Sequence, residues 1–252
     1  MNRSQRARER AVSASRGPLQ ALRGLVSEEH RLEHMVGPPG VWKESQTFQL
    51  QFLQAMGLSL EHTVLDVGCG PLRGGIVLIE YLGRGHYVGI DVRPPVIAEA
   101  RRQIIKRGLT AKQPEVYVSA SFGRDELHDR CFDVIWAFQL LYHLEDALVD
   151  EYVAQVARQL RPTGAAYANV NPQLPPGRWK EFPYLQRPLE FYQAAGRRHG
   201  LDVEALGELR DFGYTTKVAG HHNQMLRFTH PSSTEDSWCH SGHEALKGIR
   251  AD

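Results

Sequence analysis

Cysteine is scarce in this 252-residue chain: Cys69, Cys131 and Cys239 lie far apart, and no two of them form a CxxC pair. The sequence therefore predicts neither a disulfide framework nor a cysteine-based zinc site. This usage is typical of a reducing compartment, which we take to be the cytoplasm. No apolar run reaches the ~18 residues of a membrane-spanning helix. The N-terminus also lacks the apolar stretch of a signal peptide, so we expect a globular protein without a membrane partner.

An excess of charge of one sign is also absent. The formal net charge is +1, so the overall balance favours neither nucleic acid nor anionic lipid as a partner. Arginines gather in residues 1–26, which we interpret as a flexible basic tail. That cluster keeps RNA as an alternative partner that the sequence disfavours without excluding it. Residues 231–252 are polar and are expected to form a second tail.

What the chain does have is a regular alternation of apolar runs with segments of helical periodicity. Hydrophobic residues make up 42% of the sequence, enough for one domain with a sizeable core. The alternation covers residues 61–230 and predicts a doubly wound α/β domain with a parallel sheet, preceded by two helices within residues 27–60. The expected strands are residues 63–67, 86–91, 115–119, 132–137, 165–170, 202–208 and 223–229.

A glycine-rich loop directly follows the first expected strand, in the stretch TVLDVGCGPLRGG of residues 63–75. Gly68 and Gly70 permit positive φ and a close approach of a ligand to the backbone. The second strand, YVGID, ends on Asp91, 21 positions after Gly70. In doubly wound folds an acidic residue at this spacing binds a ribose diol. Together, the loop and the acidic strand end indicate a ligand that contains a nucleoside.

The same loop argues against a dinucleotide. A pyrophosphate site needs a third glycine at position 73, where this chain has Arg73. Asp66 lies two residues before the first glycine, and its charge would repel a pyrophosphate but attract an ammonium group. We therefore expect a nucleoside that carries an amino acid rather than NAD.

Three stretches together, VLDVGCG, YVGID and FDVIWAFQLLYHLED, resemble the class I S-adenosylmethionine-dependent methyltransferases. The GCGPLRGG variant and the late HHNQMLRF stretch resemble a bacterial subgroup of small-molecule and sugar methyltransferases. The resemblance covers residues 37–230. It implies a Rossmann-like, seven-stranded sheet of order 3-2-1-4-5-7-6 with strand seven antiparallel, and helices at 27–60 that act as an N-terminal lid. It also implies S-adenosylmethionine as cofactor and S-adenosylhomocysteine as product.

Carried over by position, the resemblance assigns ten residues to the cofactor. Arg73 has a solvated surface position as its alternative, and Gly74 and Gly75 are interpreted as packing residues. Ser121 stands where many family members carry an acidic residue. The ten are Asp66, Gly68, Cys69, Gly70 and Phe138 around the methionine part, Arg73 at its carboxylate, Asp91 at the ribose hydroxyls, and Val92, Ser121 and Phe122 around the adenine.

Two histidines are candidate general bases, because imidazole titrates near neutral pH. His143 follows the fourth strand; its alternative role is to pack under the cofactor. His222, with His221 beside it, lies in the loop before the last strand, at the same end of the predicted sheet. A surface pair of histidines is the alternative there.

The acceptor is expected to be a small molecule that binds against aromatic residues. The proline-rich residues 171–188, which we predict as a stiff loop, carry Trp179 and Tyr184, whose alternative role is to pack this loop against the domain. Tyr142, Trp42 and His221 are further substrate candidates. A magnesium ion would have only the neighbouring Glu145 and Asp146, so no metal site is predicted.

These observations favour a methyltransferase that acts on the hydroxyl of a sugar or specialised metabolite. Methylation of nitrogen or carbon, and a non-catalytic binding subunit, remain alternatives. The residues after the fourth strand, AFQLLY, lack the tetrapeptide of adenine-N6 DNA methylation. Nucleic-acid bases are therefore disfavoured. The oligomeric state, a homodimer included, stays open.

Overall fold

The computed structural model describes residues 28–37, 39–172, 177–216 and 222–231. The two expected tails and His221 lie outside these residues. The chain divides into two compact units, Met1–Trp42 and Lys43–Asp252. In the first unit, helix α3 (Glu28–Val36) supplies a capping carboxylate. Oε1 of Glu33 accepts hydrogen bonds from the backbone N–H groups of Gly40, Val41 and Trp42, at 2.7, 3.0 and 3.0 Å.

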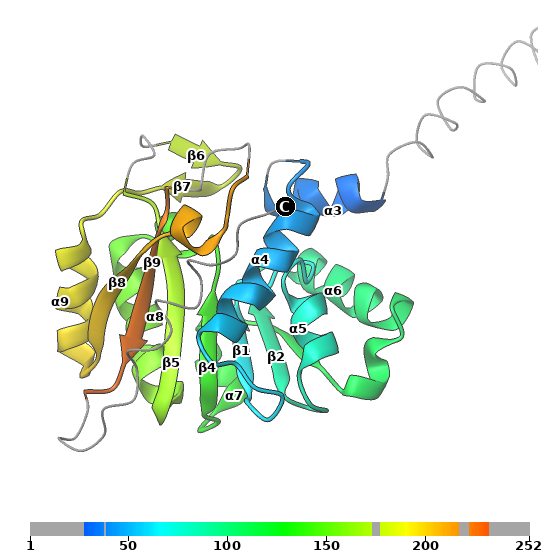
Figure 1. The fold of residues 1–252 in the computed structure, drawn as a ribbon, viewed down its shortest axis with the longest axis horizontal. Helices are drawn as coiled ribbons and strands as arrows, with labels where there is room; N and C mark the ends of the chain where they lie inside the picture. The colour runs from blue at the N-terminus through cyan, green and yellow to red at the C-terminus, as the bar shows by residue number, and fades with distance from the viewer. Residues whose placement is uncertain (1–27, 38, 173–176, 217–221, 232–252) are drawn as a thin grey trace, which may run out of the picture. The chain divides into compact units, whose positions relative to one another are not determined.

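The second unit is built on one seven-stranded sheet of order β3-β2-β1-β4-β5-β9-β8 (Figure 1). β9 is antiparallel to both of its neighbours and the other pairs are parallel. The Rossmann-like fold and the expected order, with the last strand antiparallel, are confirmed. The strands are β1 (Val64–Val67), β2 (Tyr87–Asp91), β3 (Glu115–Val118), β4 (Phe132–Ala137), β5 (Leu160–Val170), β8 (Asp202–Glu208) and β9 (Gln224–Thr229).

Alternate side chains of each strand enter two separate apolar cores. In β4, Trp136 joins the core beneath α4 (Trp42–Ala55), α5 (Gly75–Tyr81) and α6 (Pro94–Lys106). Ile135 joins the core beneath α7 (Arg124–Leu127), α8 (Asp146–Gln159) and α9 (Leu189–His199). Figure 1 shows α4 and α5 in front of the sheet and α8 behind it. Both faces are thus covered, as a parallel sheet requires.

Two local features differ from the expectations. β5 begins at Leu160 instead of at residue 165, because Phe132 of β4 pairs with Leu160; the register then shifts across residues 161–164, and pairing resumes between Val134 and Ala165. Residues within the proline-rich stretch form a hairpin of β6 (Gly177–Trp179) and β7 (Phe182–Tyr184) instead of an irregular loop. Short 3₁₀ helices occur at η1 (Leu109–Lys112), η2 (Leu141–His143) and η3 (Leu209–Phe212).

Parallel strands bring their carboxyl ends to one edge of the sheet, and ligands of doubly wound folds bind beyond that edge. The loops after β1, β2 and β4 all leave the sheet there. β8 runs parallel to β5, so the loop between β8 and β9 starts at the same edge. Figure 1 shows the β6–β7 hairpin above this end of the sheet. None of the helices in the described ranges is long and apolar enough to span a membrane.

Candidate active site

The glycine loop turns sharply at the end of β1. Gly68 and Gly70 have φ values of +75° and +58°, in the left-handed region that glycine adopts without strain. The backbone N–H groups of Gly68 and Cys69 both donate to the carbonyl of Ile90 in β2, at 2.8 and 3.0 Å. These bonds fix the loop against the strand that ends on Asp91.

Asp66 is buried beneath this loop, with 4% of its surface exposed. Its carboxylate accepts a hydrogen bond of 2.7 Å from the hydroxyl of Tyr87. Burial raises the pKa of Asp66 to about 7; the hydrogen bond from Tyr87 opposes the shift, and the nearby charge of Asp91 adds to it. A buried carboxyl group in this position is poised to gain its charge when a cation approaches.

Gly75 makes this arrangement possible. A Cβ atom on Gly75 would lie 2.3 Å from the Tyr87 hydroxyl oxygen. Gly74 also has no room for a side chain, because a Cβ atom there would lie 2.1 Å from Oε1 of Gln49 in α4. The packing interpretation of both glycines therefore agrees with the structure.

Asp91 holds the loop and its own strand end together. Oδ2 of Asp91 accepts from the backbone N–H of Gly70 at 3.2 Å. Oδ1 accepts from the backbone N–H and from Nε of Arg93, both at 3.0 Å, and Oδ2 also accepts from Nη2 of Arg93 at 2.9 Å. The residue expected at the ribose hydroxyls is thus paired with an arginine that the sequence analysis did not select.

The residues expected around the adenine differ in exposure. Val92 is 50% exposed beside Asp91, whereas Ser121 is buried. The Ser121 hydroxyl accepts a hydrogen bond of 3.3 Å from the backbone N–H of Asp125, in the first turn of α7. Phe122 has a φ of +51°, unusual for a residue with a side chain. Its ring packs edge-on against Tyr152, 5.8 Å away.

Phe138 and Cys69, both expected near the methionine part, belong to the core beneath α4. The Phe138 ring stacks on Trp136, 5.4 Å away, and meets Tyr214 edge-on at 5.7 Å. Burial raises the pKa of the Cys69 thiol well above its usual value, so this side chain packs as a small neutral group. A Cβ on Gly89 would lie 3.0 Å from it.

Arg73 is 8% exposed, so the solvated alternative does not hold. Its charge acts on two buried tyrosines: burial raises the pKa of Tyr142 and of Tyr214, and the guanidinium opposes both shifts. Tyr142 donates to Oε1 of Gln139, and the Tyr214 hydroxyl lies 2.8 Å from Oγ of Ser45. Arg73 is therefore a buried charge that acts on the substrate candidate Tyr142.

His143 contacts the β6–β7 hairpin. Its Nδ1 lies 2.9 Å from the carbonyl oxygen of Pro183. The His143 ring lies 5.1 Å from that of Tyr184, 6.0 Å from Phe182 and 6.1 Å from Trp179. Burial lowers the pKa of His143, the charge of Arg93 lowers it further, and the bond to Pro183 opposes the shift. The structure thus joins one candidate base to two of the aromatic residues expected to bind the acceptor.

The remaining candidates have different surroundings. His222 places Nδ1 2.9 Å from Oε2 of Glu208, at the end of β8. Trp42 is buried and belongs to the first compact unit. Asp146 pairs with the buried Arg187, and the described residues hold no group of three or more histidine, cysteine or acidic side chains that would bind a metal.

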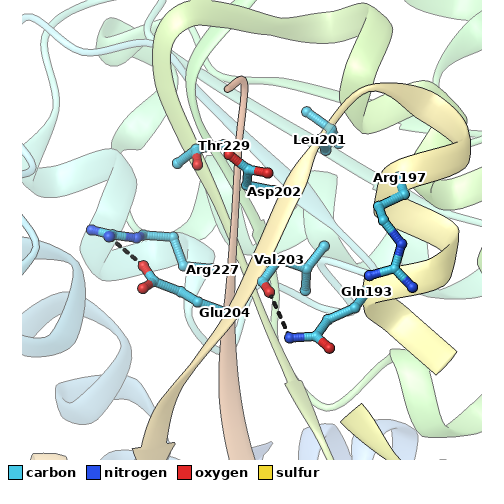
Figure 2. A pocket seen from close by; sticks show the side chains of 8 residues that line it. All are labelled: Gln193, Arg197, Leu201, Asp202, Val203, Glu204, Arg227 and Thr229. Carbon is cyan, nitrogen blue, oxygen red and sulfur yellow. Dashed lines mark hydrogen bonds and ion pairs between the residues drawn. The ribbon is translucent and has the colours of Figure 1, made fainter. Parts of the chain in front are cut away.

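A pocket of about 410 Å³ opens between α9 and the edge strand β8, but it includes no predicted site residue. Figure 2 shows the Arg227–Glu204 ion pair on one side of it and the bond from Gln193 to the Val203 carbonyl on the other. Asp202 and Thr229, which also line it, pair at the start of β8, at the sheet end opposite to the glycine loop. This pocket is therefore not the nucleoside site.

Residues 64–164 match a family model described as a methyltransferase domain. The strand order is, in addition, the one expected for the class I S-adenosylmethionine-dependent methyltransferases. That expectation is confirmed. The sugar-methyltransferase subgroup stays a prediction.

Particular relatives sharpen the comparison. The chain is 32% identical to methyltransferase GfsG of Streptomyces halstedii over 118 residues, 45% of this chain and 39% of that protein. It is 28% identical to phosphoethanolamine N-methyltransferase 1 of Arabidopsis thaliana over 175 residues, 67% of this chain and 32% of that protein. The chain thus spans less than half the length of these relatives. Magnesium protoporphyrin IX methyltransferase of Synechocystis PCC 6803, solved with bound S-adenosylmethionine, shares the fold: the TM-score is 0.56 at 14% identity, over 76% of this chain and 81% of that one.

S-adenosylmethionine is the cofactor of this class of domain, and the residues at the carboxyl edge fit it. Gly68 and Gly70 keep the loop backbone open by their positive φ values. Asp66 offers a buried carboxyl group to an ammonium, and Asp91 offers one to a ribose diol. Sequence reasoning missed Tyr87 and Arg93, which hold these two carboxylates, because only the folded structure shows which side chains their donors reach.

Proposed function

We propose that the chain is a methyltransferase that transfers the methyl group of S-adenosylmethionine to a hydroxyl of a small molecule, a sugar or specialised metabolite, in the cytoplasm. The observation that carries the proposal is the state of His143 at the carboxyl edge of the sheet. A carbonyl oxygen only accepts hydrogen bonds, so the 2.9 Å contact with Pro183 requires a proton on Nδ1 of His143. Nε2 of the neutral ring then carries the lone pair that a general base needs.

The pKa of His143 supports the same role. Because burial lowers it below its ordinary value, the imidazole is neutral at physiological pH. A neutral imidazole accepts the proton of a hydroxyl group as that oxygen becomes a nucleophile. Near pH 7, therefore, only a small fraction of the His143 side chains is protonated and unable to act as a base.

The hairpin supports an acceptor with a flat or apolar face. Trp179 and Phe182 stack with their rings 17° apart and their centroids 6.1 Å apart. Tyr184 lies 6.0 Å from Tyr142, and both rings flank His143. Aromatic faces bind both aromatic rings and the apolar faces of sugars, and they exclude water from the hydroxyl to be methylated.

The cofactor supplies the electrophilic methyl group, and the chain supplies alignment. The carboxyl group of Asp66 would hold the ammonium of the methionine part, and that of Asp91 the ribose hydroxyls. Gly68 and Gly70 would allow both contacts by keeping side chains out of the loop. Arg73, buried beside Tyr142, is suited to the methionine carboxylate.

N-methylation is the second candidate. It is favoured by the similarity to a phosphoethanolamine N-methyltransferase, which covers two thirds of this chain. A free amine is itself nucleophilic once it is neutral, so a nitrogen acceptor depends less on a general base. C-methylation and a non-catalytic binding role have no comparable support.

A methyl-transfer screen tests the proposal. The purified chain is incubated with S-adenosylmethionine labelled in its methyl group and with two panels, one of hydroxylated metabolites and sugars and one of matched amines. Transfer to a member of the hydroxyl panel, lost in His143→Gln, is the expected result. Transfer to amines alone, or transfer that His143→Gln leaves unchanged, would contradict the proposal.

A further inference from the structure

Arg93 links the expected cofactor site to the β6–β7 hairpin. Its guanidinium carbon lies 5.6 Å from the ring centre of Phe182 and 6.0 Å from that of Trp179. The same guanidinium pairs with Asp91, whose side chain is only 4% exposed. One side chain therefore contacts both the carboxylate expected at the ribose and the aromatic residues expected at the acceptor.

The hydrogen bonds of Asp91 leave no room for a further donor. A carboxylate offers about four acceptor positions, two on each oxygen. Oδ1 uses both for the backbone N–H and Nε of Arg93. Oδ2 uses both for the backbone N–H of Gly70 and Nη2 of Arg93.

A ribose diol needs one acceptor position on each oxygen. The two backbone donors are fixed by the chain, so the bonds that can be exchanged are the two from the Arg93 side chain. Those bonds also go one to each oxygen. The guanidinium fork thus occupies on Asp91 the pair of positions that two neighbouring hydroxyl groups would use.

We infer that Arg93 is a positioning residue. The ribose diol of the cofactor replaces its guanidinium on Asp91, and the movement of the guanidinium changes its contact with the β6–β7 hairpin. The inference rests on the proposed cofactor site. When the diol binds, the guanidinium leaves Asp91 but stays beside the aromatic faces of Trp179 and Phe182, which attract a cation. Because the Pro183 carbonyl of this hairpin orients His143, cofactor binding and the position of the candidate base become coupled.

The exchange makes a prediction that a purely structural role for Arg93 does not share. A guanidinium that competes for Asp91 lowers the apparent affinity for any ligand with the diol, by the fraction of molecules in which Asp91 is blocked. Replacing Arg93 therefore strengthens diol binding, whereas the loss of a structural contact would weaken it. A ligand without the hydroxyl groups has nothing to exchange and gains nothing.

Arg130 provides a matched control at the opposite edge of the sheet. It pairs with Glu115 at 2.8 Å and lies 5.6 Å from the ring centre of Phe132, so it has the same two kinds of partner as Arg93. Arg130→Ala removes an equivalent side chain without touching Asp91.

The test is calorimetric titration of the wild-type chain, Arg93→Ala and Arg130→Ala with S-adenosylhomocysteine and with its 2′,3′-dideoxy analogue. We expect Arg93→Ala to bind S-adenosylhomocysteine about tenfold more tightly than the wild type does, if Asp91 is blocked nine-tenths of the time. Its affinity for the analogue should change less than twofold, and Arg130→Ala should match the wild type with both ligands. In parallel, S-adenosylhomocysteine should change the emission of Trp179, isolated by difference from Trp179→Phe, in the wild type but not in Arg93→Ala.

The outcomes separate this inference from the proposed function. Equal or weaker binding of S-adenosylhomocysteine by Arg93→Ala, or an equal gain with the dideoxy analogue, overturns the exchange while the cofactor site stands. A Trp179 signal that persists in Arg93→Ala overturns the coupling to the hairpin. If neither the wild type nor the variants bind S-adenosylhomocysteine, the proposed cofactor site falls and the inference falls with it.

Discussion

Two carboxylates at opposite edges of the central sheet, Asp133 and Asp66, have opposite surroundings. At the amino edge, Asp133 accepts hydrogen bonds of 2.8 Å from the backbone N–H and hydroxyl of Thr63 and one of 3.0 Å from Arg161. Partial burial alone would raise the pKa of Asp133, but the bonds from Thr63 and the charge of Arg161 outweigh it and the pKa is lowered. This carboxylate is satisfied by the protein and ties the starts of strands together.

At the carboxyl edge, Asp66 has the opposite balance. It is more deeply buried, its carboxylate accepts a hydrogen bond from the Tyr87 hydroxyl, and its pKa is raised to about 7. Burying a carboxylate without a cation is costly, so such groups mark sites where a ligand supplies the charge. The difference between Asp133 and Asp66 teaches that a carboxylate satisfied by the protein stabilises the fold, whereas a buried one with a raised pKa is suited to a cationic ligand.

The largest effect is expected from a comparison of two histidines, one at each edge of the sheet. His143 at the carboxyl edge and His86 at the amino edge both place Nδ1 near a backbone carbonyl, at 2.9 and 3.1 Å. We expect His143→Gln to lower kcat about 10²–10⁴-fold, the usual contribution of a general base, without changing the affinity for S-adenosylhomocysteine. His86→Gln should retain full activity. Loss of activity in His222→Gln instead would move the base to the β8–β9 loop.

The pH profile of the same reaction shows in which direction the activity changes as His143 titrates. The pKa of His143 is lowered, so the neutral base is present above that pKa and is lost as the pH falls through it. The acid limb of kcat/KM for the acceptor, measured at saturating S-adenosylmethionine so that the titration of Asp66 does not enter, should therefore lie below pH 6.5, the ordinary value for histidine. It should disappear in the residual activity of His143→Gln. An acid limb at or above pH 7 would contradict this assignment.

Asp91→Ala should break cofactor binding. The loss of two hydrogen bonds to a charged group, each worth about 1.5–3 kcal/mol, predicts an affinity for S-adenosylhomocysteine at least about 100-fold weaker. Asp133→Ala, the equivalent change at the amino edge, should lower stability and leave the affinity unchanged. Calorimetric titration measures both. An affinity of Asp91→Ala within threefold of the wild type would show that the ribose lies elsewhere.

The raised pKa of Asp66 predicts pH-dependent binding. The ammonium of S-adenosylhomocysteine favours the charged carboxylate, so the complex should lower this pKa and release a proton near pH 7. The affinity should then fall as the pH drops below 7, by up to about tenfold per unit. Asp66→Asn should bind more weakly and without this dependence. Titrations from pH 5.5 to 7.5, in buffers of different ionisation enthalpy, measure both effects, and a constant wild-type affinity would contradict them.

Two glycines provide the mildest comparison. A Cβ atom would lie 2.3 Å from the Tyr87 hydroxyl at Gly75, and 2.7 Å from the Asp133 carbonyl at Gly164. Each alanine variant should therefore lower the free energy of unfolding by about 1–3 kcal/mol, as overpacking does. Only Gly75→Ala should also weaken S-adenosylhomocysteine binding, because it displaces the hydroxyl that holds Asp66. Chemical denaturation measures the stability of both variants, and calorimetry measures their affinity for S-adenosylhomocysteine. Equal affinities of Gly75→Ala and Gly164→Ala would show that Tyr87 does not contribute to cofactor binding.

Strand alternation allowed the doubly wound sheet to be predicted, and the spacing from Gly70 to Asp91 the ligand loop, because both are local patterns; the sheet order came from the resemblance to the class I methyltransferases. The sequence did not reveal that β5 starts at Leu160, because Pro162 and Gly164 have the composition of a turn and only pairing with β4 extends the strand. Arg93 was missed for a related reason. Its partners lie on two different elements, and a side chain that connects them leaves no periodic signal.

The hairpin shows the same limit. Prolines in residues 171–188 predicted an irregular loop, yet Pro183 lies inside β7, paired with Arg178. A two-stranded ribbon has only free outer edges, where proline is tolerated. The contact of the Pro183 carbonyl with His143, 40 residues away in the chain, requires the tertiary structure.

Calorimetric titration of the unmodified chain with S-adenosylhomocysteine, with NAD as the control ligand, tests the central claim most directly. The account predicts binding of S-adenosylhomocysteine alone, because Asp66 at the glycine loop suits an ammonium and repels a pyrophosphate. Binding of NAD alone, or of neither ligand, would contradict the assignment of the carboxyl edge as the cofactor site.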